Sequence, residues 1–176
     1  MRTARTIVPL LVGSLVVTLG ACSSGPAPRA WAASVCTVLA PWRAEIGDLA
    51  TRTQQQMTAE TTPTQAKENL TRLFGGAESA SEKARAGVEK AGVPDAEEGQ
   101  QVAEGFTASL GAMRDAYGRA RTGIDALAVS PAKDFYAKVG TVVDTLNSEY
   151  QASELDTTSL SSVELQRAFD EAPECR

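Results

Sequence analysis

VAEGFTASLGAMRDAYGRARTGIDAL, residues 102–127, is a run in which apolar side chains recur at intervals of three and four. The positions are Val102, Phe106, Leu110, Met113, Tyr117, Ala120, Ile124 and Leu127. This spacing places all of them on one face of an α-helix. Because the pattern holds over the whole run, it predicts the core seam of a helical bundle.

Weaker apolar stripes on both sides of this run predict further helices, separated by short turns rich in Pro, Gly, Ser and Thr. The expected helices span about residues 29–60, 63–91, 95–127, 131–155 and 161–172. No stretch shows the sustained two-residue alternation that predicts a β-strand. Since short connections make neighbouring helices antiparallel, we expect an all-α fold, an antiparallel four-helix bundle with a short extra C-terminal helix.

Two local features refine the first half of this fold. Pro41 falls inside the first predicted helix, where it predicts a kink or a break because proline lacks a backbone N–H. Asp95, Glu97 and Glu98 follow a Gly-Val-Pro turn, and we expect them in the first turn of the third helix. Negative charge is favourable at that end of a helix.

The last two helices carry apolar faces that we expect to point inward. Tyr150 belongs to the expected face of the fourth helix, and Val163 to that of the fifth. Thr157, Thr158 and Ser159 are expected to cap the fifth helix, because hydroxyl side chains accept hydrogen bonds from free backbone N–H groups.

The first 22 residues follow the plan of an export signal. Two arginines precede an apolar run at residues 7–19, which ends in Leu19-Gly20-Ala21-Cys22. The run is shorter than the about 20 residues that an ordinary membrane-spanning helix needs. The last four residues resemble the lipobox of bacterial lipoproteins, so we expect cleavage before Cys22 and lipid on its thiol. The alternatives are a secreted protein that is cut elsewhere and an uncleaved anchor.

This interpretation divides the chain into a signal peptide at residues 1–21, a lipid-anchored tether at 22–29 and a helical bundle domain at 30–176. Seven tether residues follow Cys22. At about 3.3 Å each, they reach at most roughly 23 Å. Because two or more acyl chains on one cysteine give a stable anchor, we expect the bundle to lie close to the extracytoplasmic face of the cell membrane.

The other two cysteines, Cys36 and Cys175, lie near the two ends of the expected domain. Outside the cytoplasm, two cysteines in a small domain usually pair. We expect a disulfide between them; two free thiols or an intermolecular bond are the alternatives. The chain has no Cys-x-x-Cys redox motif, which favours a structural role.

Charge and composition narrow the function classes. With the signal removed, 15 basic and 22 acidic side chains remain, a net charge of −7. This balance argues against a nucleic-acid partner. The chain has no histidine, and therefore lacks the commonest general base and metal ligand. We expect no cofactor, no metal and no catalytic residue.

Two clusters are candidate binding sites. Trp31 and Trp42 are eleven residues apart and could stack a ligand, but core packing is the favoured interpretation. Glu78, Glu82 and Glu89 share one face of the second helix with Arg85. Metal sites in bundles draw carboxylates from several helices, commonly with histidine, so solvated charge is the favoured interpretation here.

Three short motifs resemble the small secreted lipoproteins of unknown function that are common in actinobacteria. They are Trp31-Ala32-Ala33-Ser34-Val35-Cys36, the Ala91-Gly92-Val93-Pro94 turn and the closing Phe169-Asp170-Glu171-Ala172-Pro173-Glu174-Cys175, together with the lipobox at Cys22. The resemblance implies an extracytoplasmic α-helical domain with a bridge between its first and last cysteines. It implies no activity.

These observations favour a non-enzymatic binding or accessory module of the cell envelope. Its membrane contact is the lipid anchor, and its partner would be an envelope protein, a glycan or a lipid. The alternative is a carrier of a small ligand or lipid, for which an apolar pocket of roughly 300 Å³ between helices is required. An enzyme is the third hypothesis.

Overall fold

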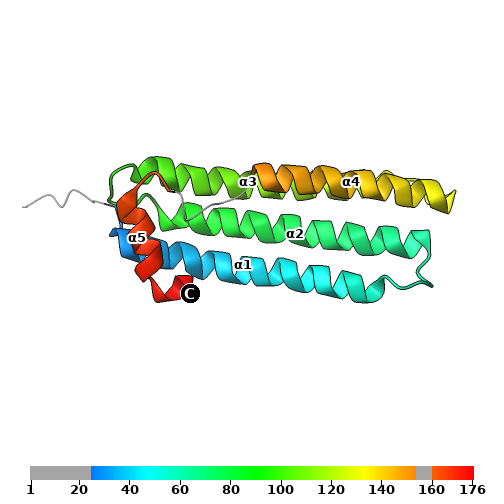
Figure 1. Cartoon of the computed structure of the whole chain (residues 1–176), viewed down its shortest axis with the longest axis horizontal. Helices are drawn as coiled ribbons and strands as arrows, with labels where there is room; N and C mark the ends of the chain where they lie inside the picture. Colours follow the sequence, from blue (N-terminus) through cyan, green and yellow to red (C-terminus); the bar gives the residue numbers. More distant parts are fainter. Residues whose placement is uncertain (1–24, 154–159) are drawn as a thin grey trace, which may run out of the picture.

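The computed structural model describes residues 25–153 and 160–176, and these residues form helices and short connections (Figure 1). The elements are α1 (Pro28–Gln56), α2 (Pro63–Ala91), α3 (Gly99–Asp125), α4 (Ala132–Ala152), α5 (Val163–Glu171) and the 3₁₀ turn η1 (Pro173–Cys175). The predicted fold, an antiparallel bundle of four long helices with a short C-terminal helix, is confirmed.

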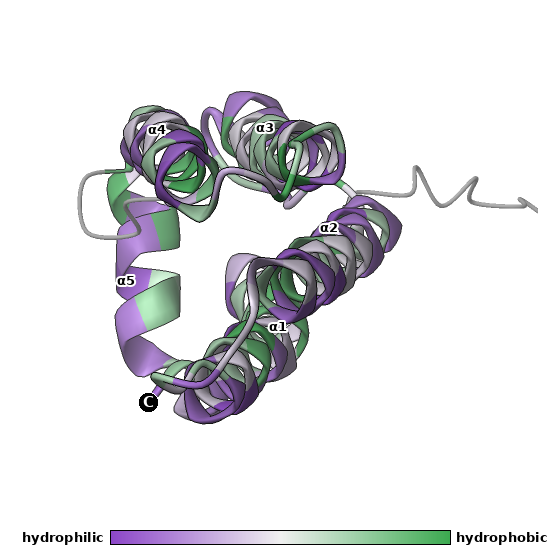
Figure 2. Ribbon diagram, turned by 90° about the vertical axis from the view of Figure 1, so that its right-hand side faces the viewer, coloured by the Kyte–Doolittle hydropathy of each residue, from purple (hydrophilic) through white to green (hydrophobic). Residues whose placement is uncertain are grey.

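The four long helices run up and down along one axis, and α5 lies across one end of the bundle (Figures 1 and 2). The most extensive interface joins α2 to α3, while α1 packs on α2 and α4 packs on α3. We call the end that holds the α2–α3 turn (residues 92–98) and α5 the proximal end. The opposite end, with the turns at residues 57–62 and 126–131, is the distal end.

The seam predicted on α3 contributes to two adjoining apolar cores. The proximal core takes Val102, Phe106, Leu110 and Met113 from α3. It is completed by α1, α2 and α5. The distal core takes Tyr117, Ala120 and Ile124 from the same helix and is completed by α2 and α4. Since α4 ends partway along the bundle (Figure 1), α5 supplies the fourth wall of the proximal half.

Three aromatic rings fix α5 to the proximal core. Phe106 and Phe169 are stacked with ring centroids 5.5 Å apart. Trp31 meets both rings edge-on, at 5.6 Å from Phe106 and 5.8 Å from Phe169. Such edge-to-face contacts are the favoured geometry for aromatic pairs, so helices from both ends of the chain are held against α3.

Helix α1 continues through Pro41, so the break predicted there does not occur. Pro41 has no N–H and cannot make its regular helical hydrogen bond. Packing of α1 against α2 compensates for this loss. Helix α1 starts at Pro28, so that two residues of the expected tether, Pro28 and Arg29, are helical. Helix α2 begins as expected at Pro63, behind a capping box formed by Thr62 and Gln65.

The predicted start of α3 near residue 95 is wrong, because the helix begins at Gly99. The backbone N–H of Asp95 donates to the carbonyl of Pro26 (2.9 Å), and Glu98 adopts a left-handed conformation with φ 59°. The Asp95 N–H, which the first turn of a helix would leave free, is thus bonded to the segment before α1, and residues 95–98 form a turn instead of helix. Asp95 and Glu97 lie outside the first helical turn, and Glu98 is the N-cap.

Two side chains predicted to point inward are exposed. Tyr150 of α4 is 39% exposed, and Val163 at the start of α5 is 70% exposed. Helix α4 lies at one edge of the bundle (Figure 2), which leaves part of its apolar face uncovered. Thr157–Ser159, expected to cap α5, lie outside the described residues. Ser162 caps this helix, accepting a hydrogen bond from Leu165 N–H.

Candidate functional site

Cys22 lies outside the described residues, as do the signal peptide and the first tether residues. Within residues 25–153 and 160–176, no helix is long and apolar enough to cross a membrane.

The predicted pairing of Cys36 with Cys175 is confirmed. Their Sγ atoms are bonded, and their Cα atoms are 5.1 Å apart. The bridge joins α1 to η1 and packs, half-buried, against the proximal core. It ties the end of the chain to the helix that follows the tether.

Both tryptophans belong to the core, as the favoured interpretation predicted. Trp31 is fully buried, and its indole N–H donates to the carbonyl of Gly92 at 2.8 Å. Trp42 is 6% exposed, and its indole N–H donates to Ser81 Oγ at 3.1 Å. Neither indole is free to stack a ligand by its face, although Trp42 contributes to the wall of a surface groove.

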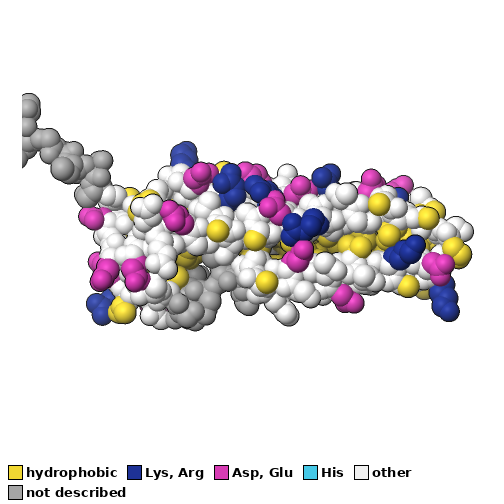
Figure 3. Space-filling model, turned by 90° about the horizontal axis from the view of Figure 1, so that it is seen from above, with side chains coloured by type: hydrophobic (Ala, Val, Ile, Leu, Met, Phe, Trp, Pro, Cys, Tyr) yellow, Lys and Arg dark blue, Asp and Glu magenta, His cyan; other side chains and the backbone are white. Residues whose placement is uncertain are grey.

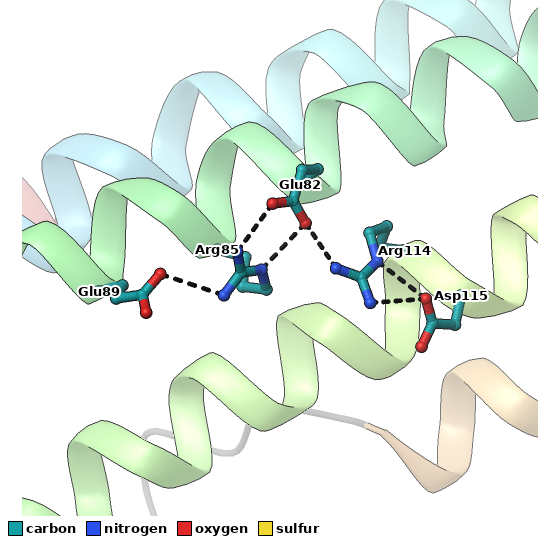
Figure 4. Close-up of polar contacts among 5 residues, drawn as sticks. All are labelled: Glu82, Arg85, Glu89, Arg114 and Asp115. Atoms are coloured by element: carbon teal, nitrogen blue, oxygen red, sulfur yellow. Dashed lines mark hydrogen bonds and ion pairs between the residues drawn. The ribbon is translucent and has the colours of Figure 1, made fainter.

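The carboxylates of α2 are engaged by arginines rather than gathered around a cation (Figure 4). Glu82 accepts hydrogen bonds from Arg85 (2.8 Å) and from Arg114 of α3 (2.7 Å). The same arginines reach Glu89 (3.1 Å) and Asp115 (2.7 Å). Hydrogen bonds from Arg85 and then Arg114 lower the pKa of Glu82 to about 2. The network joins α2 to α3 on the surface of their interface.

Among the described residues, no group of three or more Asp, Glu or Cys side chains is arranged to hold a metal ion. Asp95, Glu97 and Glu98 are exposed at the proximal end.

A groove between α1 and α2 is lined mainly by apolar surface, and we call it the α1–α2 groove. It encloses about 300 Å³. Its residues are Thr37, Val38, Pro41, Trp42 and Glu45 of α1, and Ala80, Lys83, Ala84 and Gly87 of α2. The positions recur every three or four residues on each helix, so each helix presents one face. Small side chains on α2 leave the space open.

Polar groups lie at the edges of the α1–α2 groove. Pro41 has no N–H, so the carbonyl of Thr37 in the groove wall lacks its regular helical donor. Glu45 and Lys83 are exposed, and neither takes part in an ion pair with a described residue. The groove therefore combines an apolar surface with a backbone acceptor and one charge of each sign.

Other hollows are larger but more polar or more open. One of about 390 Å³ next to the disulfide is lined by Arg43, Asp170 and Arg176 among others. On the α3–α4 face, hydrophobic side chains follow the seam between the two helices in the distal half (Figure 3). Val139, Val142 and Val143 are half-buried there against the distal core.

The groove was not identified as such from the sequence. The sequence feature that points to the groove is the stripe of small residues on the second helix, including Ala80 and Ala84. Small side chains bury little area against a neighbouring helix. Tertiary contacts determine which helix packs over this stripe. They also determine that Pro41 lies beside it.

Comparison with protein-family models, with curated proteins and with solved structures found no match to this chain.

Proposed function

We propose that this chain is a bacterial lipoprotein, cleaved before Cys22 and anchored by lipid to the extracytoplasmic face of the cell membrane, whose bundle is a non-enzymatic binding module. The observation that carries the proposal is the bridge between Cys36 and Cys175, read together with Leu19-Gly20-Ala21-Cys22. Disulfides form and persist outside the cytoplasm. With two cysteines paired, Cys22 is the one cysteine left for lipid.

Membrane retention tests the anchor. Full-length protein produced in a bacterial host should be recovered with the membrane fraction, and Cys22→Ala should shift it to the soluble fraction. Ser23→Ala is the matched control, because it changes the neighbouring residue and keeps the thiol. Retention of Cys22→Ala on membranes would contradict the anchor.

Crosslinking in intact cells tests the binding role. A partner protein, glycan or lipid should be recovered with wild-type protein after crosslinking, and its recovery should fall when the bundle is destabilised by removal of the disulfide. Recovery of no partner from intact cells would count against a binding module.

The second candidate function is carriage of a small apolar ligand or lipid, and the α1–α2 groove favours it. Its volume of about 300 Å³ is at the lower end of small-molecule sites. The Thr37 carbonyl, which lacks its regular donor at Pro41, and the charges of Glu45 and Lys83 suit an amphipathic molecule with a polar group at the groove edge.

Trp42 provides an internal reporter for this second function. Binding of an environment-sensitive fatty-acid dye measures occupancy of the groove. A fatty acid that carries a nitroxide, which quenches only at short range, should quench Trp42 and leave the fully buried Trp31 unaffected, as judged from Trp42→Phe and Trp31→Phe variants. Thr37→Trp, which places a large side chain in the groove, should abolish binding. Thr51→Trp, on the exposed surface of the same helix, is the matched control. Equal dye binding by the two variants would rule out the groove.

A further inference from the structure

The tether is docked on the bundle before α1 begins. The carbonyl of Pro26 accepts a hydrogen bond from Asp95 N–H in the α2–α3 turn (2.9 Å). Gly25 lies so close to the same turn that a methyl group on it would overlap the carbonyl oxygen of Val93. Only glycine allows this approach of two backbones. The chain therefore meets the bundle at Gly25, three residues earlier than Pro28.

This contact shortens the free part of the tether. Three peptide links join Cys22 to Gly25, and at 3.8 Å per link they span at most about 11 Å. The full tether expected from the sequence would reach roughly twice as far. If Cys22 carries lipid, as proposed above, the α2–α3 turn stays within about 11 Å of the lipidated residue. The headgroup region of the bilayer is about 5–8 Å thick on each side, so the turn is held at or close to it.

The same end of the bundle exposes apolar side chains. Val93 in the α2–α3 turn is 45% exposed and Val163 at the start of α5 is 70% exposed, the two most exposed large hydrophobic residues that the structure describes. Val163 borders a shallow hollow with Glu97 and Glu98 of the turn, which places both valines at the proximal end. Neither valine is needed for the core.

The charged side chains of the proximal end determine which kind of lipid headgroup it can contact. Asp95, Glu97, Glu98 and Glu164 are exposed around the two valines. The basic side chains exposed at the same end are Arg167, Lys90 in the last turn of α2 and Arg29 in the first turn of α1, so acidic groups outnumber basic ones. A surface of this charge is repelled by anionic lipid within the screening distance of about 8–10 Å. It is compatible with zwitterionic headgroups.

We propose that the proximal end is a membrane-docking surface: the Gly25 contact holds the α2–α3 turn at a zwitterionic headgroup layer, Val93 and Val163 enter that layer, and the distal turns project outward. Helix α2 has 29 residues and is about 43 Å long at 1.5 Å per residue. The proposal rests on the lipidation of Cys22 proposed above.

Energy transfer to the membrane surface tests this proposal. Full-length lipidated protein is labelled at Lys90→Cys near the proximal end or at Ala59→Cys near the distal end, and bound to phosphatidylcholine vesicles with a headgroup-linked acceptor dye. Energy transfer to the acceptor dye should be strong from a label at Lys90→Cys and weak from a label at Ala59→Cys. Equal transfer from both sites, or stronger transfer from Ala59→Cys, would overturn the docking surface. Failure of the protein to float with the vesicles would instead overturn the anchor, and with it this proposal.

Two sets of variants separate the contribution of the two valines from that of the Gly25 contact. The double variant Val93→Ser/Val163→Ser should lose most of the proximal transfer, while Tyr150→Ser, at another exposed apolar side chain away from this end, should retain it. Gly25→Ala should release the tether and also reduce proximal transfer, without loss of helicity by circular dichroism. Insertion of Gly-Ser repeats between Ser24 and Gly25 lengthens the tether but leaves the Gly25 contact unchanged. This insertion should also reduce the proximal energy transfer.

Vesicles that contain phosphatidylglycerol provide a further readout. Their negative charge should lower the proximal transfer relative to phosphatidylcholine alone, and added salt should restore it. Unchanged transfer in the valine and tether variants, or higher transfer on anionic vesicles, would contradict the proposed surface.

Discussion

The indole N–H of Trp42 donates a hydrogen bond to the hydroxyl of Ser81 across the α1–α2 interface, at 3.1 Å. Ser81 is fully buried and Trp42 nearly so. A buried indole without an acceptor loses the hydrogen bond that water would have provided. The contact therefore explains why a polar residue stands among the small apolar residues of α2.

Removal of the Ser81 hydroxyl should destabilise the bundle. Ser81→Ala leaves the indole N–H of Trp42 buried without a partner, for which we expect a loss of about 1–3 kcal/mol in the free energy of unfolding. Urea denaturation followed by circular dichroism measures it. Ser79→Ala, on the exposed side of α2, should change little. Equal stability of the two variants would contradict this account of the contact.

The disulfide should contribute a large part of the stability. Its cysteines are 139 residues apart in sequence, and the chain-entropy estimate for such a loop is up to about 5 kcal/mol. Cys36→Ser/Cys175→Ser should therefore unfold at markedly lower urea concentration. Intact mass spectrometry after thiol alkylation should find no free thiol on these cysteines before reduction. Two alkylated thiols in native protein would contradict the bridge.

Acid should weaken the α2–α3 network through Glu82. Arginine hydrogen bonds lower its pKa from 4.5 to about 2, so the folded state favours the carboxylate. The resulting stability is present above about pH 4.5 and is lost as the pH falls towards about 2. Glu82→Gln should be less stable than wild type at pH 7, and the difference should shrink across this range. Glu68→Gln, an exposed site on the same helix, is the control. A difference that is independent of pH would contradict the assignment.

Pro41 should lower the stability of α1. Proline in a helix interior costs about 3 kcal/mol because it removes a hydrogen bond and clashes with the preceding turn. Pro41→Ala should raise the free energy of unfolding by about 1–3 kcal/mol. It also gives the Thr37 carbonyl its regular donor, so dye binding in the α1–α2 groove should weaken. Pro63→Ala, at the first position of α2 where proline is tolerated, should change stability little. A destabilised Pro41→Ala would show that the surrounding packing requires the ring.

The helices themselves could be predicted because their signals are local. The spacing of Val102 to Leu127 determines one face of α3, and Thr62 with Pro63 marks the start of α2 whatever lies beside it. The start of α3 could not be predicted, because its turn is held by Pro26 from a segment about seventy residues earlier. The apolar side chain of Val163 predicts an inward position, whereas its exposure depends on where α5 crosses the bundle.

The sequence alone determined the helical class, the antiparallel order and the partners Cys36 and Cys175, because periodicity, short connections and the number of cysteines are properties of the chain itself. The tertiary structure decided the rest. Glu82 meets Arg114, Gly25 reaches Val93, and Pro41 and Ala84 line the same groove. These relationships between distant segments depend on how packed faces come together, and they place Gly25 and Pro26, expected in a free tether, against the α2–α3 turn.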